Sequence, residues 1–183
     1  MRTTSVLKVL KRYKLFIIIL IINLIFAVIS PELGKSSFEI TKDNLIEMLT
    51  IIPPIFILLG LLDVWVDKET MMKFLGKGSG IKGILIAFAL GSAAAGPLYA
   101  AFPIATIMMK KRASLFNVFI FIGAWSTTKI PMLTFETGSL GVPFAVTRLL
   151  MNIVGILVIA FIVEKSLKKE EQENVYKLSE ENI

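Results

Sequence analysis

The sequence predicts an all-α, polytopic membrane protein, and three observations lead to this prediction. Hydrophobic residues make up 55% of the 183 positions and are gathered into long blocks. Most of the Lys and Arg residues lie at the edges of these blocks. The blocks are also long enough, with their flanks, to engage the roughly 30 Å hydrocarbon core of a bilayer as helices. We therefore expect a membrane domain at residues 15–163, a basic segment at 1–14 and a polar tail at 164–183.

The amino-acid composition excludes several kinds of chemistry. The chain has no Cys and no His, which removes disulfides, thiolate nucleophiles, imidazole bases and the commonest metal ligand. We expect no cofactor, no metal site and no enzymatic activity. The formal charge of +6 comes from cations that flank the apolar blocks, where anionic lipid headgroups attract them. Membrane lipid, and not nucleic acid, is the expected partner of this charge.

Five apolar blocks are predicted to engage the membrane, at residues 15–29, 45–66, 83–109, 115–135 and 142–163. The first is preceded by cations, as a signal peptide is, but its end, Ala27-Val28-Ile29, lacks the small residues of a cleavage site. We therefore expect this block to be retained as a membrane anchor. The polar tail alternates acidic residues with lysines, which is typical of a solvated helix that frays.

The distribution of Lys and Arg predicts the topology, because cytoplasmic loops collect cations. If all five blocks crossed the membrane, nine of the cations outside the blocks would lie on each side. If residues 83–109 instead entered from the cytoplasm, broke and returned, 16 would lie inside and two outside. If residues 115–135 were the re-entrant element, 13 would lie inside and five outside. We predict four full spans in the inner membrane, a re-entrant hairpin at 83–109 and both termini in the cytoplasm, and the alternative at 115–135 stays open.

The third block has the features of a broken helix. Its 27 residues would make a straight helix about 40 Å long, whereas two halves of about 20 Å each reach the middle of the bilayer. Non-helical backbone at membrane depth persists only where protein or a water-filled cavity surrounds it. This predicts a solute site, although small residues and Pro also occur at helix contacts and kinks. The centre reads GSAAAGPLYAAFP, and its candidate residues are Gly91, Ser92, Gly96, Pro97 and Pro103.

A second polar interruption lies in the fourth block, in the stretch GAWSTTKIPM at residues 123–132. Pro131 frees the backbone carbonyl one turn earlier, near Thr127, and the nearby hydroxyls are expected to bond loosened backbone groups. Half-helices that end near the midplane present donors and positive dipole ends to a substrate. The predicted pathway residues here are Ser126, Thr127, Thr128, Lys129 and Pro131.

Charged side chains inside the blocks are further candidates for function. Lys129 costs roughly 2.5 to 3.5 kcal/mol in a lipid-facing span, so it is expected to face the bundle interior or to snorkel outward. Arg148 enters the outer half of the bilayer from the fifth block, with Asn152 one turn deeper on the same helix face. Two cations there favour an anionic or electron-rich substrate unless carboxylates pair with them. The candidate charge partners or relays are Glu47, Asp63 and Glu136.

A family resemblance lies in residues 91–141. The order there is a small-residue and Pro segment, an aliphatic run, a short basic loop, a second apolar segment and another polar segment that ends in Pro. This order resembles the predicted permease family that includes the organoarsenical efflux permeases (ArsP-like). Larger members of that family have two related halves, so the resemblance implies that this chain, as one half, forms a homodimer with parallel subunits. It also implies movement of a small solute or ion along a pathway that the residues named at 91–103 and 123–132 line or shape.

One departure from the family pattern limits what the resemblance implies. Members that handle thiophilic arsenicals often place Cys in the small-residue segment, where this chain has Ser92 and alanines. The substrate is therefore not carried over. Two alternative functions stay open, which are a small homodimeric channel without alternating access and a scaffold whose polar residues only join helices.

Overall fold

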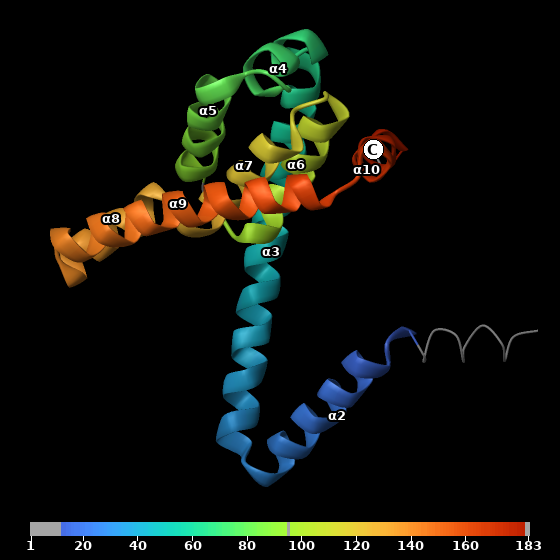
Figure 1. Cartoon of the computed structure of the whole chain (residues 1–183). Coiled ribbons are helices and arrows are strands. Elements are labelled where there is room, and N and C mark those ends of the chain that lie inside the picture. The colour runs from blue at the N-terminus through green and yellow to red at the C-terminus, as the bar shows by residue number, and fades with distance from the viewer. Residues whose placement is uncertain (1–11, 95, 182–183) are drawn as a thin grey trace, which may run out of the picture. The chain divides into compact units, whose positions relative to one another are not determined.

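The computed structural model describes residues 12–94 and 96–181, and all the secondary structure in this part is helical (Figure 1). Most of the basic segment predicted at residues 1–14 lies outside the described residues. In chain order the elements are α2 (Lys14–Ile29), α3 (Pro31–Trp65), α4 (Lys68–Leu75), α5 (Gly80–Ala93), the 3-10 turn η1 (Leu98–Ala100), α6 (Ala101–Lys110), α7 (Leu115–Thr127), α8 (Ile130–Leu140), α9 (Val142–Ser166) and α10 (Lys169–Glu181).

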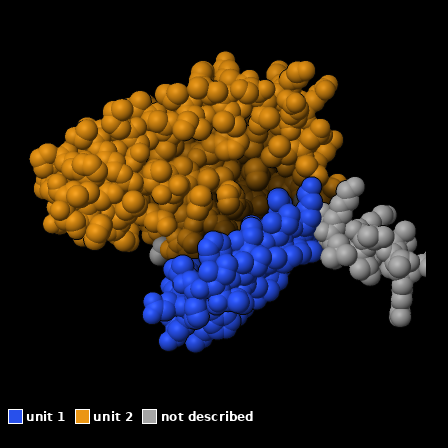
Figure 2. All heavy atoms as spheres, turned by 90° about the horizontal axis from the view of Figure 1, so that it is seen from below, with its two compact units in different colours: residues 1–52 blue, residues 53–183 orange. Residues whose placement is uncertain are grey.

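The chain divides into two compact units, residues 1–52 and 53–183, which Figure 2 colours separately. α3 runs through the division, which falls just before the Pro53-Pro54 pair inside this helix. Each proline removes one backbone donor, so the hydrogen-bond ladder of α3 is interrupted at that point.

The first unit contains α2 and the beginning of α3. These helices approach closely at Gly34, where a Cβ atom would lie 2.5 Å from the Ala27 Cα atom. The Ser37 hydroxyl donates to the Asn23 amide oxygen across the same pair of helices, at 2.6 Å. A glycine contact and one polar bond therefore hold this pair together.

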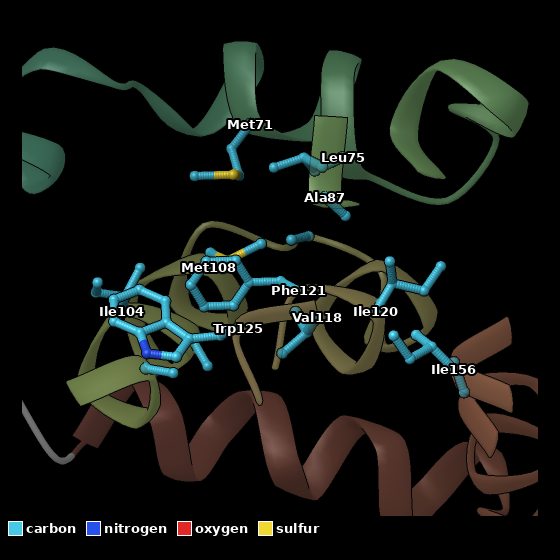
Figure 3. Close-up of a cluster of buried hydrophobic side chains, with 14 of the residues drawn as sticks. Met71, Leu75, Ala87, Ile104, Met108, Val118, Ile120, Phe121, Trp125 and Ile156 are labelled. Carbon is cyan, nitrogen blue, oxygen red and sulfur yellow. The ribbon is translucent and has the colours of Figure 1, made fainter. Parts of the chain in front are cut away.

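The second unit is built around α7, which contacts α5, α6 and α9. Figure 3 shows its buried apolar cluster, in which Val118, Phe121 and Trp125 of α7 lie among side chains of the neighbouring helices. In a bilayer such packing holds helices together through van der Waals contact, because lipid tails are as apolar as the side chains. α7 is therefore the element on which the other helices of this unit are positioned.

Three helical stretches of the described residues are long and apolar enough to cross a membrane: Pro31–Leu62, Leu115–Leu140 and Val142–Ser166. α4 and α5, which are bent by 106° at their junction, make a fourth if the pair counts as one span. The first predicted block forms the 16-residue helix α2, which is shorter than these stretches. The chain is thus a multi-pass membrane protein, and the count of four full spans plus a re-entrant hairpin stays a prediction.

Two loops, the end of α3 and the tail are joined at one end of the second unit. Lys111, which is only 6% exposed, donates to the carbonyls of Leu62, at 3.1 Å, and Val66 at the end of α3. A cation at a helix C-terminus stabilises its unpaired carbonyls. Lys77, in the loop between α4 and α5, donates to the Gln172 side chain of α10 at 3.1 Å. The end of α3, the α4–α5 loop, the α6–α7 loop and α10 therefore form one assembly.

The polar tail is docked, and the prediction of a fraying, solvated helix was wrong. Arg112 contacts both carboxylate oxygens of Glu173, at 2.9 and 3.0 Å, and Glu180 at 3.1 Å. The Tyr176 hydroxyl donates to the Ala113 carbonyl at 3.0 Å, and Tyr176 is 5% exposed. Burial raises the pKa of Tyr176, and the hydrogen bond to Glu173 raises the pKa of Arg112. Both groups therefore keep their protons at neutral pH, and α10 stays attached to the α6–α7 loop.

Candidate functional site

The chain leaves the helical conformation between α5 and η1, inside the third apolar block. α5 ends at Ala93, and Ala94 is extended. Gly96 has a φ of 97°, a left-handed conformation that residues with a Cβ rarely adopt. Pro97 then starts η1 with φ −70° and ψ 160°. The segment between α5 and η1 therefore depends on a glycine followed by a proline, and the Pro97 carbonyl accepts from the Ala100 N–H at 3.1 Å as η1 begins.

A second interruption separates α7 from α8. α7 ends at Thr127, and Thr128 and Lys129 carry non-helical dihedrals before α8 begins. Pro131 is the second residue of α8, where a missing N–H leaves no helical bond unmade. It does remove the donor that would have reached the Thr127 carbonyl from a continuous helix. This carbonyl must therefore find another partner.

The two interruptions contact each other. The Ser92 and Thr128 hydroxyl oxygens lie 2.8 Å apart, and the Thr128 hydroxyl also donates to the Ala124 carbonyl at 3.1 Å. Since a hydroxyl has one proton, Ser92 is the donor in the bond between them. Lys129, which is half-buried, donates from its ammonium group to the Gly96 carbonyl. One polar bond and one charged bond thus join residues that are more than 30 positions apart.

Trp125 is a residue of this site that the sequence reasoning missed. Its indole N–H is shared between the carbonyls of Gly96, at 3.3 Å, and Pro97, at 3.2 Å. The ring is 5% exposed and packs edge-on against Phe121, with ring centres 5.5 Å apart. A buried indole N–H needs an acceptor, and the Gly96 carbonyl lies outside α5 and η1, so the tryptophan next to a helix interruption was a signal that could have predicted this contact. Trp125 holds the α5–η1 break against α7.

Arg148 of α9 satisfies the end of α7. Its guanidinium donates to the Thr127 carbonyl at 3.3 Å, and the Asn152 amide lies 3.5 Å from the same oxygen. This is the carbonyl that Pro131 leaves free. The sequence predicted that nearby hydroxyls would bond loosened backbone, but Thr127 donates to the Gly123 carbonyl instead, at 2.9 Å. Side chains of α9 therefore supply the missing donors.

A buried ion pair lies beside this contact. Arg148 binds one carboxylate oxygen of Glu136 on α8, and Glu136 is 5% exposed. The other carboxylate oxygen, Oε2, is buried without a hydrogen-bond partner in the described part of the chain. Glu47 lies exposed on α3 in the first unit, and the Asp63 side chain lies outside the described residues. Of the three candidate carboxylates, Glu136 is the one that the structure pairs with a site cation.

Of the remaining predicted residues, some are packed between helices and others are exposed. A Cβ at Gly91 would lie 2.5 Å from the Phe121 carbonyl oxygen and 2.9 Å from the Trp125 nitrogen. Gly91 therefore permits the close contact of α5 with α7. Pro103 lies in the first turn of α6 and is half-buried, and Ser126 is exposed on α7.

The site offers polar chemistry and no metal-binding cluster. Among residues 12–94 and 96–181, no group of three or more His, Cys, Asp or Glu side chains is placed to hold a metal ion. The groups present are an ammonium, a guanidinium, a carboxylate, hydroxyls and unwound backbone. Such groups are able to bind a polar or charged solute through hydrogen bonds and charge.

Comparison of the sequence with known protein families identifies the family of this chain. The family described as "Predicted permease", of the ArsP type, matches residues 33–182. This match covers α3 to α10 and therefore all of the second unit that contains the site. No curated protein and no solved structure matches the chain.

Proposed function

Since this chain belongs to the predicted permease family, we propose that it moves a small anionic or electron-rich solute across the cytoplasmic membrane. The pathway is a cavity between the discontinuous segments at residues 91–103 and 123–132. The observation that carries this proposal is the bond from the Lys129 ammonium to the Gly96 carbonyl, because it joins two interruptions of apolar helices. Unwound backbone deep in a membrane needs protein or water around it, and a lysine there marks a polar route.

The charges of the site favour a negative or electron-rich solute. Glu136 neutralises Arg148 through one oxygen, while Lys129 contacts a neutral carbonyl. The positive charge of Lys129 is therefore not neutralised by this carbonyl and attracts an anion. α8 begins next to Lys129 without a side-chain cap, so its first N–H groups add positive partial charge at the same place.

The assembly at the end of the second unit supports the predicted topology. Lys77, Arg112 and the tail helix α10 are in contact, so their loops must lie on one side of the membrane. A model in which all five blocks cross puts the α4–α5 loop and the tail on opposite sides. A re-entrant 115–135 puts the α6–α7 loop and the tail on opposite sides. Of the three courses compared, the re-entrant course of residues 83–109 is the one that keeps the three together, and the cation distribution favours the cytoplasm as their side.

The family pattern of two related halves leads us to propose a parallel homodimer in the inner membrane, with both termini in the cytoplasm. In this arrangement the solute meets Ser92, Ser126 and Lys129, and two copies supply the halves of one pathway. Rocking of the copies about the bound solute alternates access between the two sides. A channel of the same architecture would instead conduct continuously.

Transport by reconstituted protein tests this function. A thermal-shift screen of oxyanions, arsenicals and small organic anions first selects a solute that stabilises the purified protein. Uptake of that solute into proteoliposomes is then compared among wild type, Lys129→Met and Lys82→Met, a matched control for an exposed lysine. We expect at least roughly a tenfold loss of uptake with Lys129→Met and none with Lys82→Met.

Two outcomes would revise the proposal. Equal uptake by both lysine variants would remove Lys129 from the pathway. Single-channel currents with a flux far above carrier rates would replace the carrier by a channel.

Single cysteines test the topology, since the chain has none of its own. Ser139→Cys and Lys177→Cys place a thiol on the α8–α9 end and on the tail, and both positions are exposed. A membrane-impermeant maleimide added to whole cells should label Ser139→Cys and leave Lys177→Cys unlabelled. The reverse pattern would contradict the predicted topology.

A further inference from the structure

A cleft of about 530 Å³ lies in the second unit, apart from the helix interruptions. It is lined by the glycine-rich loop between α4 and α5, by the start of α7 and by the α9–α10 junction. The proposed transport does not use it. Its volume falls in the range of small-molecule binding sites.

Cations from three different elements line this cleft. They are Lys77 of the α4–α5 loop, Lys165 in the last turn of α9 and Lys169 at the start of α10, with Glu164 as the opposing carboxylate. Lys165 and Lys169 are exposed, and Lys77 also bonds Gln172. Three lysines against one glutamate give the cleft a positive potential, which attracts anions.

Backbone and hydroxyl donors face the same space. Ser79 precedes α5 but does not cap it, because its oxygen instead accepts from the Asn117 amide at 3.0 Å. The first N–H groups of α5 therefore lack a side-chain partner, and the Ser79 hydroxyl keeps its own proton to donate. Ser114 accepts from the Asn117 backbone N–H at 3.3 Å and likewise keeps its proton. Such a glycine-rich loop before a helix N-terminus is suited to bind phosphate.

Asn117 supplies an independent indication of a ligand. The residue is 2% exposed and lines the cleft, and its amide nitrogen donates to the Leu75 carbonyl at 2.9 Å and to Ser79. These two bonds fix which end of the amide is nitrogen. Its oxygen, Oδ1, is then a buried acceptor without a donor in the described residues. A buried acceptor without a hydrogen bond costs roughly 1 to 3 kcal/mol of stability. A bound molecule with a hydroxyl group would recover this free energy by donating to the oxygen.

We propose that this cleft binds a phosphate group that carries a hydroxyl, held by Lys77, Lys165, Lys169 and the start of α5. The phosphate oxygens accept from the lysines, the Ser79 hydroxyl and the free N–H groups, and the ligand hydroxyl donates to Asn117 Oδ1. Two sources have this chemistry, the headgroup of phosphatidylglycerol and inorganic hydrogen phosphate. α9, the apolar stretch that precedes Lys169, ends at Ser166, so the cleft lies where headgroups meet the protein.

Binding to the full-length protein in neutral detergent tests this site. Native mass spectrometry counts bound dioctanoylphosphatidylglycerol, with dioctanoylphosphatidylcholine as the zwitterionic control, and calorimetry measures binding of inorganic phosphate. The cleft variant is Lys165→Gln/Lys169→Gln. The matched variant is Lys168→Gln/Lys177→Gln, which removes the same charge from exposed positions that do not line the cleft.

We expect one anionic ligand per chain in wild type and in the matched variant, and roughly tenfold weaker binding in the cleft variant. If only the lipid binds in this manner, the source is the membrane, and if phosphate also binds, the source includes soluble phosphate. Equal binding by both variants, or no saturable binding of either probe, would overturn the proposal. Should the cleft variant fail to fold, Lys77→Gln takes its place, and unchanged affinity there would overturn the proposal equally.

Discussion

The two ends of α7 differ sharply, although one helix and one apolar cluster connect them. At the first end, Ser114 caps the helix and donates its own backbone N–H to the Leu75 carbonyl at 2.8 Å. Lys111 and the docked α10 are attached beside it. At the other end, α7 stops at Thr127 and the chain runs through Lys129 before α8 begins. We call the first the anchored end and the second the open end.

The difference between the ends concerns how backbone groups are satisfied. The anchored end combines a helix cap and the backbone bond to Leu75 with bonds to the end of α3 and to the tail, all within one assembly. At the open end, Trp125 of α7 and Lys129 after it bond the α5–η1 break, and Arg148 of α9 bonds the Thr127 carbonyl. A hydrogen bond from a side chain across a helix interruption breaks more readily than the backbone hydrogen bonds within a helix. Two-state behaviour is therefore expected at the open end, where a solute would compete for the same groups.

The largest effect is expected from breaking the buried ion pair of the open end. Arg148→Met leaves Glu136, which is 5% exposed, with an uncompensated buried charge and should destabilise the protein by about 3 kcal/mol. Unfolding in mixed micelles with added SDS measures this loss. Arg148→Met/Glu136→Gln should recover most of it, and equal instability of the single and double variants would show that the charge pairing is not the cause.

A smaller loss of about 2 kcal/mol is expected for Gly91→Ala. The new methyl group would meet the Phe121 carbonyl oxygen at 2.5 Å and force α5 away from α7. Gly155→Ala is the matched control, because nothing lies within 4 Å of a Cβ there. The same unfolding assay should leave the control at or above wild-type stability, and equal stability of the two variants would contradict the close contact.

Trp125→Phe keeps most of the ring and removes the N–H that the Gly96 and Pro97 carbonyls share. The expected loss of stability is about 1 kcal/mol. Because Trp125 and Lys129 both hold the Gly96 carbonyl, loss of the indole N–H weakens the attachment of the α5–η1 segment, and its amides should exchange faster with deuterium. Unchanged exchange at residues 94–100 would mean that Trp125 does not hold the break.

The smallest effect is expected at the anchored end. Arg112→Gln removes contacts with Glu173 and Glu180, whose side chains are 49% and 41% exposed, so the loss of stability should stay below about 1 kcal/mol. Proteolysis of the tail should nevertheless become faster at low salt, where wild type is protected. A loss as large as that of Arg148→Met would erase the distinction between the two ends.

The sequence predicted the open end better than the anchored end. Gly96-Pro97 and Pro131 are residues that interrupt helices, so the places where the chain leaves the helix were readable. The hydrogen-bond partners at these places could not be predicted. The residue that bonds the free Thr127 carbonyl is decided by the packing of α9 against α7, which the sequence pattern does not show. Nothing local distinguishes Arg148 from a cation that snorkels outward.

The tail was predicted wrongly for a related reason. Alternating charges indicate a solvated helix when the segment is considered alone, but Tyr176 and Glu173 find partners in the α6–α7 loop, more than 60 residues away. The cations of that loop were counted for topology and not as docking groups. Lys111 was likewise treated as a loop cation, whereas it is buried against α3.

Water access to the open end is the central claim, and cysteine reactivity measures it most directly. Ser126→Cys tests the open end, and Val158→Cys is the control, at a position that is 50% exposed on the apolar face of α9. We predict that a charged methanethiosulfonate reagent modifies Ser126→Cys in membranes and leaves Val158→Cys unmodified. If Ser126→Cys were as unreactive as Val158→Cys, lipid and not water would surround the break, and the proposed pathway would be contradicted.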